Sequence, residues 1–270
     1  MKMAPVAVFA FNRPVHLAKC LEALRNNPGS AETELHIFCD GARGARDTAG
    51  VQAVRDLARS TRGFASVNVV EQLTNLGLAN SVIAGVNSLL ACYDDLIVLE
   101  DDLVVSEHFL SFMNAALELY RDEPRVASIH AYLYPLKADV PDTFFLRGAD
   151  CWGWATWARA WKVFDADGEA LLRKLRAGRL EHAFDLDGAY PYTRMLEEQV
   201  AWRNSSWAIR WHASCFLADM LTLYPGHSLV QNIGNDASGT HCADTDQFLV
   251  DGLHRPVRLE RIAAVESQTA

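Results

Sequence analysis

Short hydrophobic runs alternate with helical patterns along the first half of the chain. The runs at residues 6–11, 35–39, 67–70 and 96–99 are nearly continuous, which is typical of strands that are buried on both faces. Between the runs, hydrophobic residues recur every three or four positions, as they do on one face of a helix. This alternation predicts an α/β fold, in which helices cover both faces of a mostly parallel sheet.

Four hydrophobic stripes define the predicted helices of this half. They lie at Leu17, Cys20, Leu21 and Leu24, at Val51, Val54 and Leu57, at Leu78, Val82, Val86 and Leu89, and at Phe109, Phe112, Met113, Ala116, Leu117 and Tyr120. Pro28-Gly29 ends the first helix and Pro124 ends the last, because neither residue type continues a helix easily. The polar residues that follow the strands therefore lie at the carboxyl edge of the sheet, where ligands of such folds bind.

Beyond the fourth helix the pattern becomes irregular. Residues 126–129 and 144–146 predict short strands, residues 168–180 predict a charged helix, and another helix starts near Trp207. No linker rich in proline, glycine or serine interrupts the chain, and no repeat is found. We therefore expect a single structural unit over residues 1–270.

Charge narrows the range of partners. The formal net charge is −9, which argues against a nucleic acid, because phosphate binding needs a basic surface. The one basic cluster, at residues 173–179, is interpreted as the solvated face of a helix, so we expect at most peripheral contact with a membrane. The sequence leaves the oligomeric state open.

Cysteine spacing and the first residues bear on the compartment. The six cysteines show neither the spacing of a zinc site nor that of a redox pair, and most lie in hydrophobic runs. The run at residues 5–11 stops at Asn12-Arg13-Pro14 without a cleavage site, and no run approaches the roughly 18 residues of a membrane span. A cytoplasmic location is expected.

Glu100-Asp101-Asp102 follows the fourth strand and is the strongest local motif. Mg²⁺ and Mn²⁺ take oxygen ligands and bind through one or two carboxylates together with substrate phosphates. Because successive strand side chains point in opposite directions, the three cannot share one ion equally. We expect Asp102 to bind the metal, with Asp101 and Glu100 serving a sugar, a ribose or metal-bound water. The alternative is a solvated acidic turn.

The first two strands also end in polar residues. Asn12-Arg13-Pro14 stands where the first ligand loop is expected, but the glycine-rich loops of dehydrogenases and P-loop proteins are missing there. Arg13 is a candidate ligand residue, or a surface charge at a helix start. Asp40 is interpreted either as an acceptor for a nucleobase or ribose, or as the cap of a turn with Gly41.

Tryptophans cluster between residues 151 and 161. Trp152-Gly153-Trp154 predicts a stacking wall for a sugar, with Gly153 allowing the close approach of a ligand, although an ordinary aromatic core has the same composition. Asp150 precedes the wall and is a candidate base or a helix-start residue.

Farther on, residues 236–241 form a small-residue loop of the kind that closes over a ligand, and His241 is a candidate contact.

Taken together and in this order, these segments resemble the GT-A glycosyltransferase superfamily. VAVFAFNRPVHLAKCLEAL resembles its first strand and helix, and FCDG at 38–41 and NLGLAN at 75–80 resemble the ends of the next two strands. VLEDDLVVSEHFLSFMNAAL at 98–117 is similar to the acidic region of the N-acetylglucosaminyltransferase that starts complex N-glycans. CWGWATWARAW and SWAIRWHASCFLADMLTLYPGHSLVQNIGNDASGTHC resemble bacterial sugar transferases.

The resemblance implies a Rossmann-like GT-A fold and an inverting, Mn²⁺- or Mg²⁺-dependent transferase of the hexosyltransferase type. The implied donor is a nucleotide sugar of the UDP type, and the implied acceptor is a glycan or glycolipid in surface polysaccharide or glycoconjugate synthesis. Residues 1–125 would bind the nucleotide, and residues 126–270 would bind the acceptor and supply a lid at 234–241. The implied donor-site residues are Phe11, Asn12, Arg13, Asp40, Asn75, Gly77, Asn80, Glu100, Asp101, Trp152, Gly153, Trp154, Trp207 and His241, with Asp102 on the metal.

One departure from the family pattern concerns the base. Similar enzymes have an acidic residue beside the tryptophan that matches Trp207, but here the neighbours are Ser205, Ser206 and Ala208. Asp150 is therefore the candidate base. The missing acid also motivates one alternative, a nucleotide-sugar-binding protein without turnover. A second alternative is a metal-dependent phosphohydrolase that uses the same acidic strand end.

Overall fold

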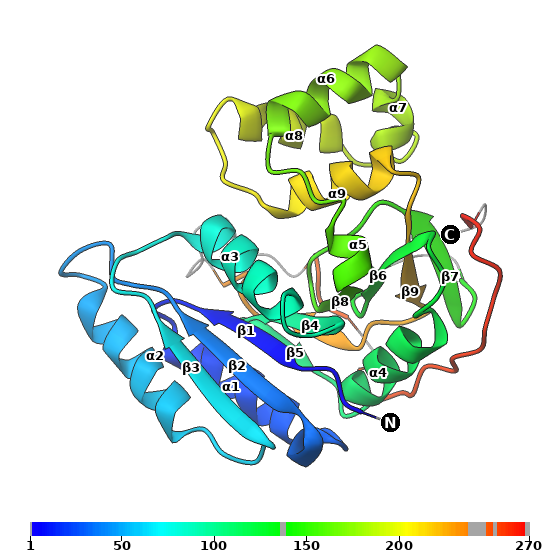
Figure 1. The fold of residues 1–270 in the computed structure, drawn as a ribbon. Helices are drawn as coiled ribbons and strands as arrows, with labels where there is room; N and C mark the ends of the chain where they lie inside the picture. The colour runs from blue at the N-terminus through cyan, green and yellow to red at the C-terminus, as the bar shows by residue number, and fades with distance from the viewer. Residues whose placement is uncertain (1, 136–138, 237–246, 251–252, 268–270) are drawn as a thin grey trace.

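An eight-stranded mixed sheet forms the centre of the molecule in the computed structural model, which describes residues 2–135, 139–236, 247–250 and 253–267 (Figure 1). The strand order is β3-β2-β1-β4-β8-β6-β9-β7. Its first four strands are parallel, namely β1 (Val6–Ala10), β2 (Glu34–Cys39), β3 (Ser66–Glu71) and β4 (Asp95–Glu100). The expected α/β fold is confirmed, and the four strands agree with the predicted runs to within one or two residues.

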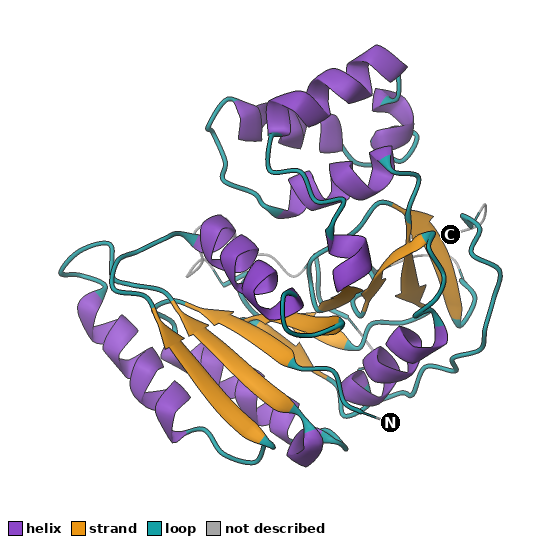
Figure 2. Ribbon diagram, viewed as in Figure 1, coloured by secondary structure: helices purple, strands orange, loops and turns teal. Residues whose placement is uncertain are grey.

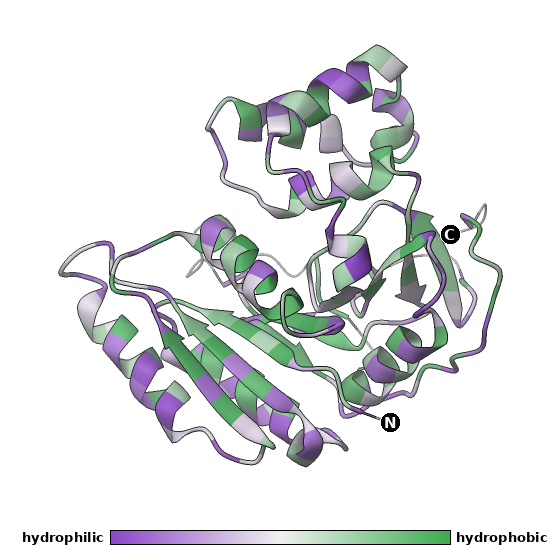
Figure 3. Cartoon of the chain, viewed as in Figure 1, coloured by the Kyte–Doolittle hydropathy of each residue, from purple (hydrophilic) through white to green (hydrophobic). Residues whose placement is uncertain are grey.

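Helices cover both faces of the parallel strands. The helices are α1 (Pro14–Arg25), α2 (Thr48–Ser60), α3 (Leu78–Leu90) and α4 (Phe109–Leu119). The order β3-β2-β1-β4 with right-handed crossovers places α1 and α2 on one face and α3 on the other. Gly85 of α3 packs so closely on Phe9 and Phe38 that a Cβ atom would lie 2.6 Å from the Phe9 ring. Figure 3 shows the buried strands as mostly hydrophobic.

The second half of the sheet mixes directions. β8 (Trp154–Trp157) is antiparallel to both β4 and β6 (Val126–His130), and β7 (Thr143–Arg147) is antiparallel to β9 (Leu221–Pro225). Only β6 and β9 pair in parallel here. A separate ribbon pairs β5 (Leu103–Val105) with β10 (Val230–Asn232). Through this ribbon, residues 230–232 lie beside residues 103–105, which closely follow the end of β4.

A layer of helices with its own small core lies above the sheet (Figure 2). Its helices are α6 (Gly168–Gly178), α7 (Glu181–Phe184), α8 (Tyr192–Val200) and α9 (Ala208–Leu217), and a short α5 (Ala158–Trp161) leads to it from β8. Asp167 caps α6 by accepting a hydrogen bond from the amide of Ala170 (2.9 Å). The predicted charged helix at 168–180 is thus present as α6, whereas the sequence did not predict α8.

Two further expectations concern membranes and cysteines. Within the described part of the chain, no helix is long and hydrophobic enough to cross a bilayer. Five cysteines lie in that part, all of them free thiols, and Cys20, Cys39 and Cys215 are buried. Buried cysteines of this kind pack as small hydrophobic residues.

Candidate functional site

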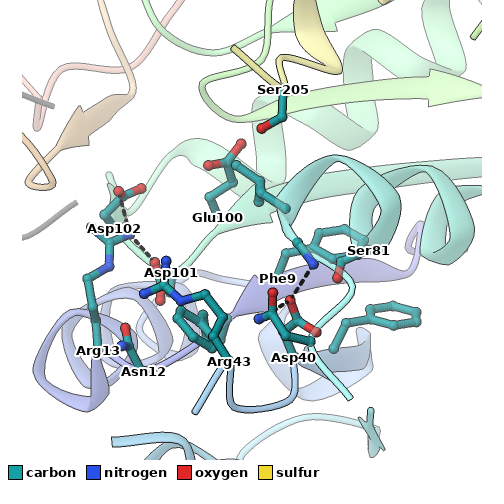
Figure 4. Close-up of a pocket in the computed structure, with 16 residues that line it drawn as sticks. Phe9, Asn12, Arg13, Asp40, Arg43, Ser81, Glu100, Asp101, Asp102 and Ser205 are labelled. Atoms are coloured by element: carbon teal, nitrogen blue, oxygen red, sulfur yellow. Dashed lines mark hydrogen bonds and ion pairs between the residues drawn. The ribbon is translucent and has the colours of Figure 1, made fainter. Parts of the chain in front are cut away.

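Two adjoining cavities lie at the carboxyl edge of the parallel strands. The smaller has a volume of about 300 Å³ and the larger about 600 Å³. Four residues line both of them, Leu78, Glu100, Asp102 and Ser205, so the two cavities meet at the end of β4. Figure 4 shows Ser205 across from Glu100 at this junction. A ligand with two parts can therefore span the smaller and the larger cavity.

Strand register brings the predicted ligand residues of the smaller cavity together. β1 pairs with β4 so that Phe9 lies opposite Glu100, and with β2 so that Ala10 lies opposite Cys39. The residues after these strands consequently meet at one edge. The predicted residues that line the smaller cavity are Phe11, Asn12, Arg13, Asp40, Asn75, Gly77, Glu100, Asp101 and Asp102.

Arg13 binds both aspartates of the acidic motif. Its Nη2 donates to Oδ1 of Asp101, and to Oδ2 of Asp102 at 2.7 Å (Figure 4). The two carboxylates are only 4% and 6% exposed. Burial alone lowers the pKa of the Arg13 guanidinium, but the charges of Asp101 and Asp102 outweigh burial and hold that pKa above its ordinary value. Arg13 is therefore the internal counter-ion of the acidic motif.

The acidic motif still carries excess negative charge. Burial, followed by the neighbouring charges of Asp102 and Asp101, raises the pKa of Glu100 to about 8, against the opposing effects of Arg13 and a hydrogen bond from Trp207. Burial also raises the pKa of Asp101 to about 6, although Arg13 acts in the opposite direction. Three carboxyl groups face one guanidinium here. Such a site gains free energy from an added cation.

Asp40 organises the loop after β3. Its carboxylate accepts hydrogen bonds from the amides of Gly41 (2.8 Å), Leu76 (2.8 Å) and Gly77 (2.9 Å) and from Nδ2 of Asn75 (3.0 Å). Both oxygens are thus engaged within the protein. Of the two interpretations made from the sequence, the structure favours a capping role, and Asp40 shapes the cavity wall.

Three aromatic rings form part of the wall of the smaller cavity. The rings of Phe9 and Phe38 stack with centroids 4.9 Å apart, and the guanidinium of Arg43 lies 4.7 Å from the ring of Phe11. Ser81 also lines this cavity, and within the described structure its buried Oγ has no hydrogen-bond partner. A flat heterocycle with polar edges fits such a wall, because the rings contact its faces and the hydroxyl can bind its edge.

Ser81→Ala should lower the affinity for a nucleotide without lowering the stability of the protein. Removing a buried hydroxyl that lacks a partner should leave the free protein as stable as before, or up to about 1 kcal/mol more stable. Nucleotide affinity should fall about 3- to 10-fold, the value of one ordinary hydrogen bond. Thermal unfolding and calorimetric titration measure the two effects. Ser88→Ala on the same helix is the control, because the hydroxyl of Ser88 is already bonded to Gly85 O (2.8 Å). Equal nucleotide affinities for Ser81→Ala and the parent protein would contradict the prediction.

Gly234 lies directly against Asp102. The amide of Ile233 donates to Asp102 O (2.8 Å), which continues the β5–β10 ribbon to this point. A Cβ atom on Gly234 would lie 2.1 Å from Asp102 Oδ2. The start of the predicted lid at 234–241 therefore touches the predicted metal ligand, and a larger residue at 234 would have to displace the Asp102 side chain.

Gly234→Ala should weaken metal binding while the fold is kept, because the new methyl group displaces the Asp102 carboxylate. We expect a 10- to 100-fold loss of Mn²⁺ affinity, the usual size of an effect on ligand orientation, measured by titration with electron paramagnetic resonance. Gly44→Ala is the control, since a Cβ atom at Gly44 meets nothing within 4 Å. An unchanged affinity in Gly234→Ala would show that Asp102 does not bind the ion.

The tryptophan wall is only partly as expected. Trp152 and Trp207 line the larger cavity. Trp154 is fully buried, packs on Trp161, Trp207 and Trp211, and lines neither cavity, so its predicted contact with a sugar is wrong. Gly153 lines neither cavity as well. Its positive φ of 75° and the nearness of Val230, 2.8 Å from a Cβ position, show that it serves packing on the ribbon.

Asp150 also lies outside both cavities. Its Oδ1 accepts a hydrogen bond from the amide of Cys151 (2.8 Å), and its Oδ2 lies 3.9 Å from Nδ1 of the buried His130. Its charge also raises the pKa of Tyr132, after burial as the main cause. This placement among buried aromatic residues contradicts Asp150 as the residue that takes a proton from a substrate in the cleft.

Two other predicted residues do not contribute to the described site. Asn80 is exposed on the first turn of α3, donates to Leu76 O (2.9 Å) and lines neither cavity. It stabilises the start of the helix instead. His241 lies outside the described residues.

Several lining residues were missed from the sequence. In the smaller cavity they are Phe9, Ala10, Phe38, Arg43, Leu78, Ser81 and Ser205. Arg43 could have been found, because it closely follows the Asp40-Gly41 turn at the same sheet edge. In the larger cavity the helical layer supplies Tyr190, Pro191, Arg194, Met195, Glu198 and Asn204. No local pattern marks these residues, because their role depends on how the helical layer sits over the sheet.

Comparison with known proteins adds little to this geometry. No family model and no curated protein sequence matches the chain. Among solved structures, it is similar to the mannosyltransferase PcManGT from Pyrobaculum calidifontis in complex with GDP-Man and Mn²⁺, at 14% identity over 80% of this chain and 70% of that chain, with a TM-score of 0.45. Similarity at this level does not establish a shared function, so the proposal below depends on the cleft of this chain.

Proposed function

We propose that the protein is a metal-dependent glycosyltransferase with a GT-A arrangement, which moves a sugar from a nucleotide sugar to an acceptor hydroxyl. The observation that carries the proposal is the acidic end of β4, where Glu100 and Asp102 line both cavities. The smaller, aromatic-lined cavity suits a nucleotide, and the larger cavity suits a sugar and its acceptor. The diphosphate that joins nucleotide and sugar then lies at Asp102.

A divalent cation fits the chemistry of this junction. Asp101 and Asp102 offer the hard oxygen donors that Mg²⁺ and Mn²⁺ prefer. Glu100, whose pKa is raised to about 8, holds its proton at neutral pH and can release it when a cation binds beside it. No group of three or more potential metal ligands is present among the described residues, so an ion here would need substrate phosphates as further ligands. When bound, the ion supplies charge neutralisation for the leaving diphosphate.

The chain's own residues have distinct tasks in this proposal. Asp40 fixes the loop that bears Asn75 and Gly77 beside the nucleotide. Arg13 holds Asp101 and Asp102 in the free protein and is placed to contact a phosphate when the aspartates turn to the ion. Trp152 and Trp207 form a wall of the larger cavity for the sugar. Together these groups orient the anomeric carbon toward the acceptor.

The proposal also covers the donor, the stereochemistry of transfer and the acceptor. We infer a UDP-sugar donor, inversion at the anomeric carbon in a single displacement, and a glycan or glycolipid acceptor in surface polysaccharide or glycoconjugate synthesis in the cytoplasm.

A non-catalytic nucleotide-sugar-binding protein is the second candidate, because Ser205, and not an acid, stands at the junction beside Trp207. Incubation with UDP-, GDP- and TDP-sugars and Mn²⁺ distinguishes the two. Sugar transfer or donor hydrolysis supports the transferase, whereas nucleotide binding without either reaction supports the binding protein. Phosphate release from simple esters without a nucleotide would instead indicate a phosphohydrolase.

A further inference from the structure

The larger cavity brings a carboxylate to the acceptor side of the cleft. Glu100 and Asp102 line this cavity from the end of β4, and Glu198 lines it from α8 in the helical layer. We infer that Glu198 is the base that removes the proton of the acceptor hydroxyl, an inference that rests on the glycosyltransferase function proposed above. It replaces the acid that is missing beside Trp207.

Local contacts place Glu198 next to the segment that lacks the acid. Its backbone carbonyl accepts hydrogen bonds from the amides of Arg203 (2.8 Å) and Asn204 (3.4 Å), which folds the chain back toward Ser205 at the end of α8. Ser205 lines both cavities. A carboxylate on α8 therefore faces the same cavity as a carboxylate at position 205 would.

The Glu198 side chain is held but remains accessible. Arg194, one turn earlier on α8, donates from Nε to Oε1 at 3.1 Å, and the Glu198 side chain is 32% exposed. Arg194 and Glu198 both line the larger cavity. An exposed pair of this type contributes little to stability, so it does not explain by itself why an acid is present at 198.

The other two carboxyl groups of the larger cavity, those of Glu100 and Asp102, lie on the side assigned to the diphosphate. Inversion requires attack on the face of the anomeric carbon opposite the leaving diphosphate, so the base cannot stand beside the diphosphate. Asp102 is bonded to Arg13, and Glu100 precedes it at the end of β4, on the side assigned to the diphosphate. Glu198 comes from α8 in the helical layer, a different element from β4, and lines the same cavity as Glu100 and Asp102.

The proposed step conserves atoms and charge. The Glu198 carboxylate takes the proton of the acceptor hydroxyl while the acceptor oxygen forms a bond to the anomeric carbon. The bond from that carbon to the diphosphate oxygen breaks, and its electron pair leaves with the nucleoside diphosphate. Glu198 then releases the proton to water. The overall products are the new glycoside, the nucleoside diphosphate and one proton.

Glu198→Gln tests the inference, with Glu197→Gln as a matched control. Glu197 is the neighbouring acid on α8, and its pair with Arg176 (2.6 Å) lies on the surface. Glu198→Gln should lower kcat at least about 100-fold, the usual contribution of a general base, and leave donor affinity unchanged. The acidic limb of the kcat/KM profile should disappear with it. Glu197→Gln should behave like the parent protein in all three measurements.

A carboxylate restored at position 205 provides the second test. Ser205→Asp in the Glu198→Gln background should recover part of the lost turnover, because it returns a base to the junction of the cavities. An active parent protein with an equally active Glu198→Gln variant overturns the inference alone. So does a variant that loses donor affinity and turnover in the same proportion, which indicates a structural role. A parent protein that transfers no sugar removes the proposed function, and the inference with it.

Discussion

Asp102→Ala is expected to abolish the metal-dependent part of donor binding. In the parent protein, Mn²⁺ should strengthen nucleotide affinity at least about 100-fold, or about 3 kcal/mol, since ion and diphosphate share the junction of the cavities. Without the Asp102 carboxylate the ion would lose the ligand proposed for it, and Arg13 would be left bonded to Asp101. Calorimetric titration with UDP in the presence and absence of Mn²⁺ should therefore give equal affinities for the variant.

Asp94→Ala is the matched control for this experiment. Asp94 is an exposed acid just before the opposite end of β4, so its removal changes the net charge equally but leaves the cleft intact. It should keep the full response to Mn²⁺. Both variants should unfold at temperatures close to that of the parent protein. An Asp102→Ala protein that still binds UDP more tightly with Mn²⁺ would remove the metal site from β4, and with it the basis of the proposed function.

The donor half of this site could be predicted from local sequence. β1, β2 and β4 are mostly buried and read as continuous hydrophobic runs, whereas β3 is a partly exposed edge strand, so its expected burial on both faces is wrong. Parallel pairing nevertheless places the carboxyl ends of all four strands at one edge. Arg13, Asp40 and Asp102 are 89 residues apart at most, yet each directly follows or closely follows a strand end. The positions of the strand ends along the sequence are therefore sufficient to predict that these three residues meet.

The acceptor half could not be predicted in the same way. β8 enters the sheet antiparallel between β4 and β6, and no short-range pattern specifies that pairing. As a result, Trp154 reads like a ligand wall in the sequence but forms the core under α9. Glu198 lies on α8, a helix that the sequence did not predict, so nothing in the sequence marked it as a candidate. Only the position of the helical layer over the sheet shows that Trp154 is buried and that Glu198 lines a cavity.

Arg13→Met is expected to destabilise the metal-free protein strongly at alkaline pH and weakly at acidic pH. Removing one partner of a buried ion pair costs about 3 kcal/mol or more when the other partner stays charged. The pKa of Asp101 is raised to about 6 and that of Glu100 to about 8, both above their ordinary values of 3.8 and 4.5. The folded protein therefore binds these protons more tightly than the unfolded chain does.

The sign of the pH dependence follows from that difference. Between about pH 4 and pH 8 the folded state holds more protons than the unfolded state, so the free energy of unfolding falls as the pH rises. Loss of the guanidinium raises both pKa values further and steepens the fall. Urea unfolding at pH 5.5 and pH 8.5 should show a large loss for Arg13→Met at the higher pH only, and Mn²⁺ should reverse much of it.

Arg43→Met is the control that separates charge from packing. Arg43 lines the same cavity, but its side chain is 53% exposed and pairs with Asp47 at the surface, where ion pairs contribute little to stability. Its replacement should give a small effect that is the same at both pH values. If Arg13→Met also lost equal stability at pH 5.5 and pH 8.5, the guanidinium would be acting through its packing. The carboxylates of β4 would then not form the charged site that a divalent ion and a diphosphate require.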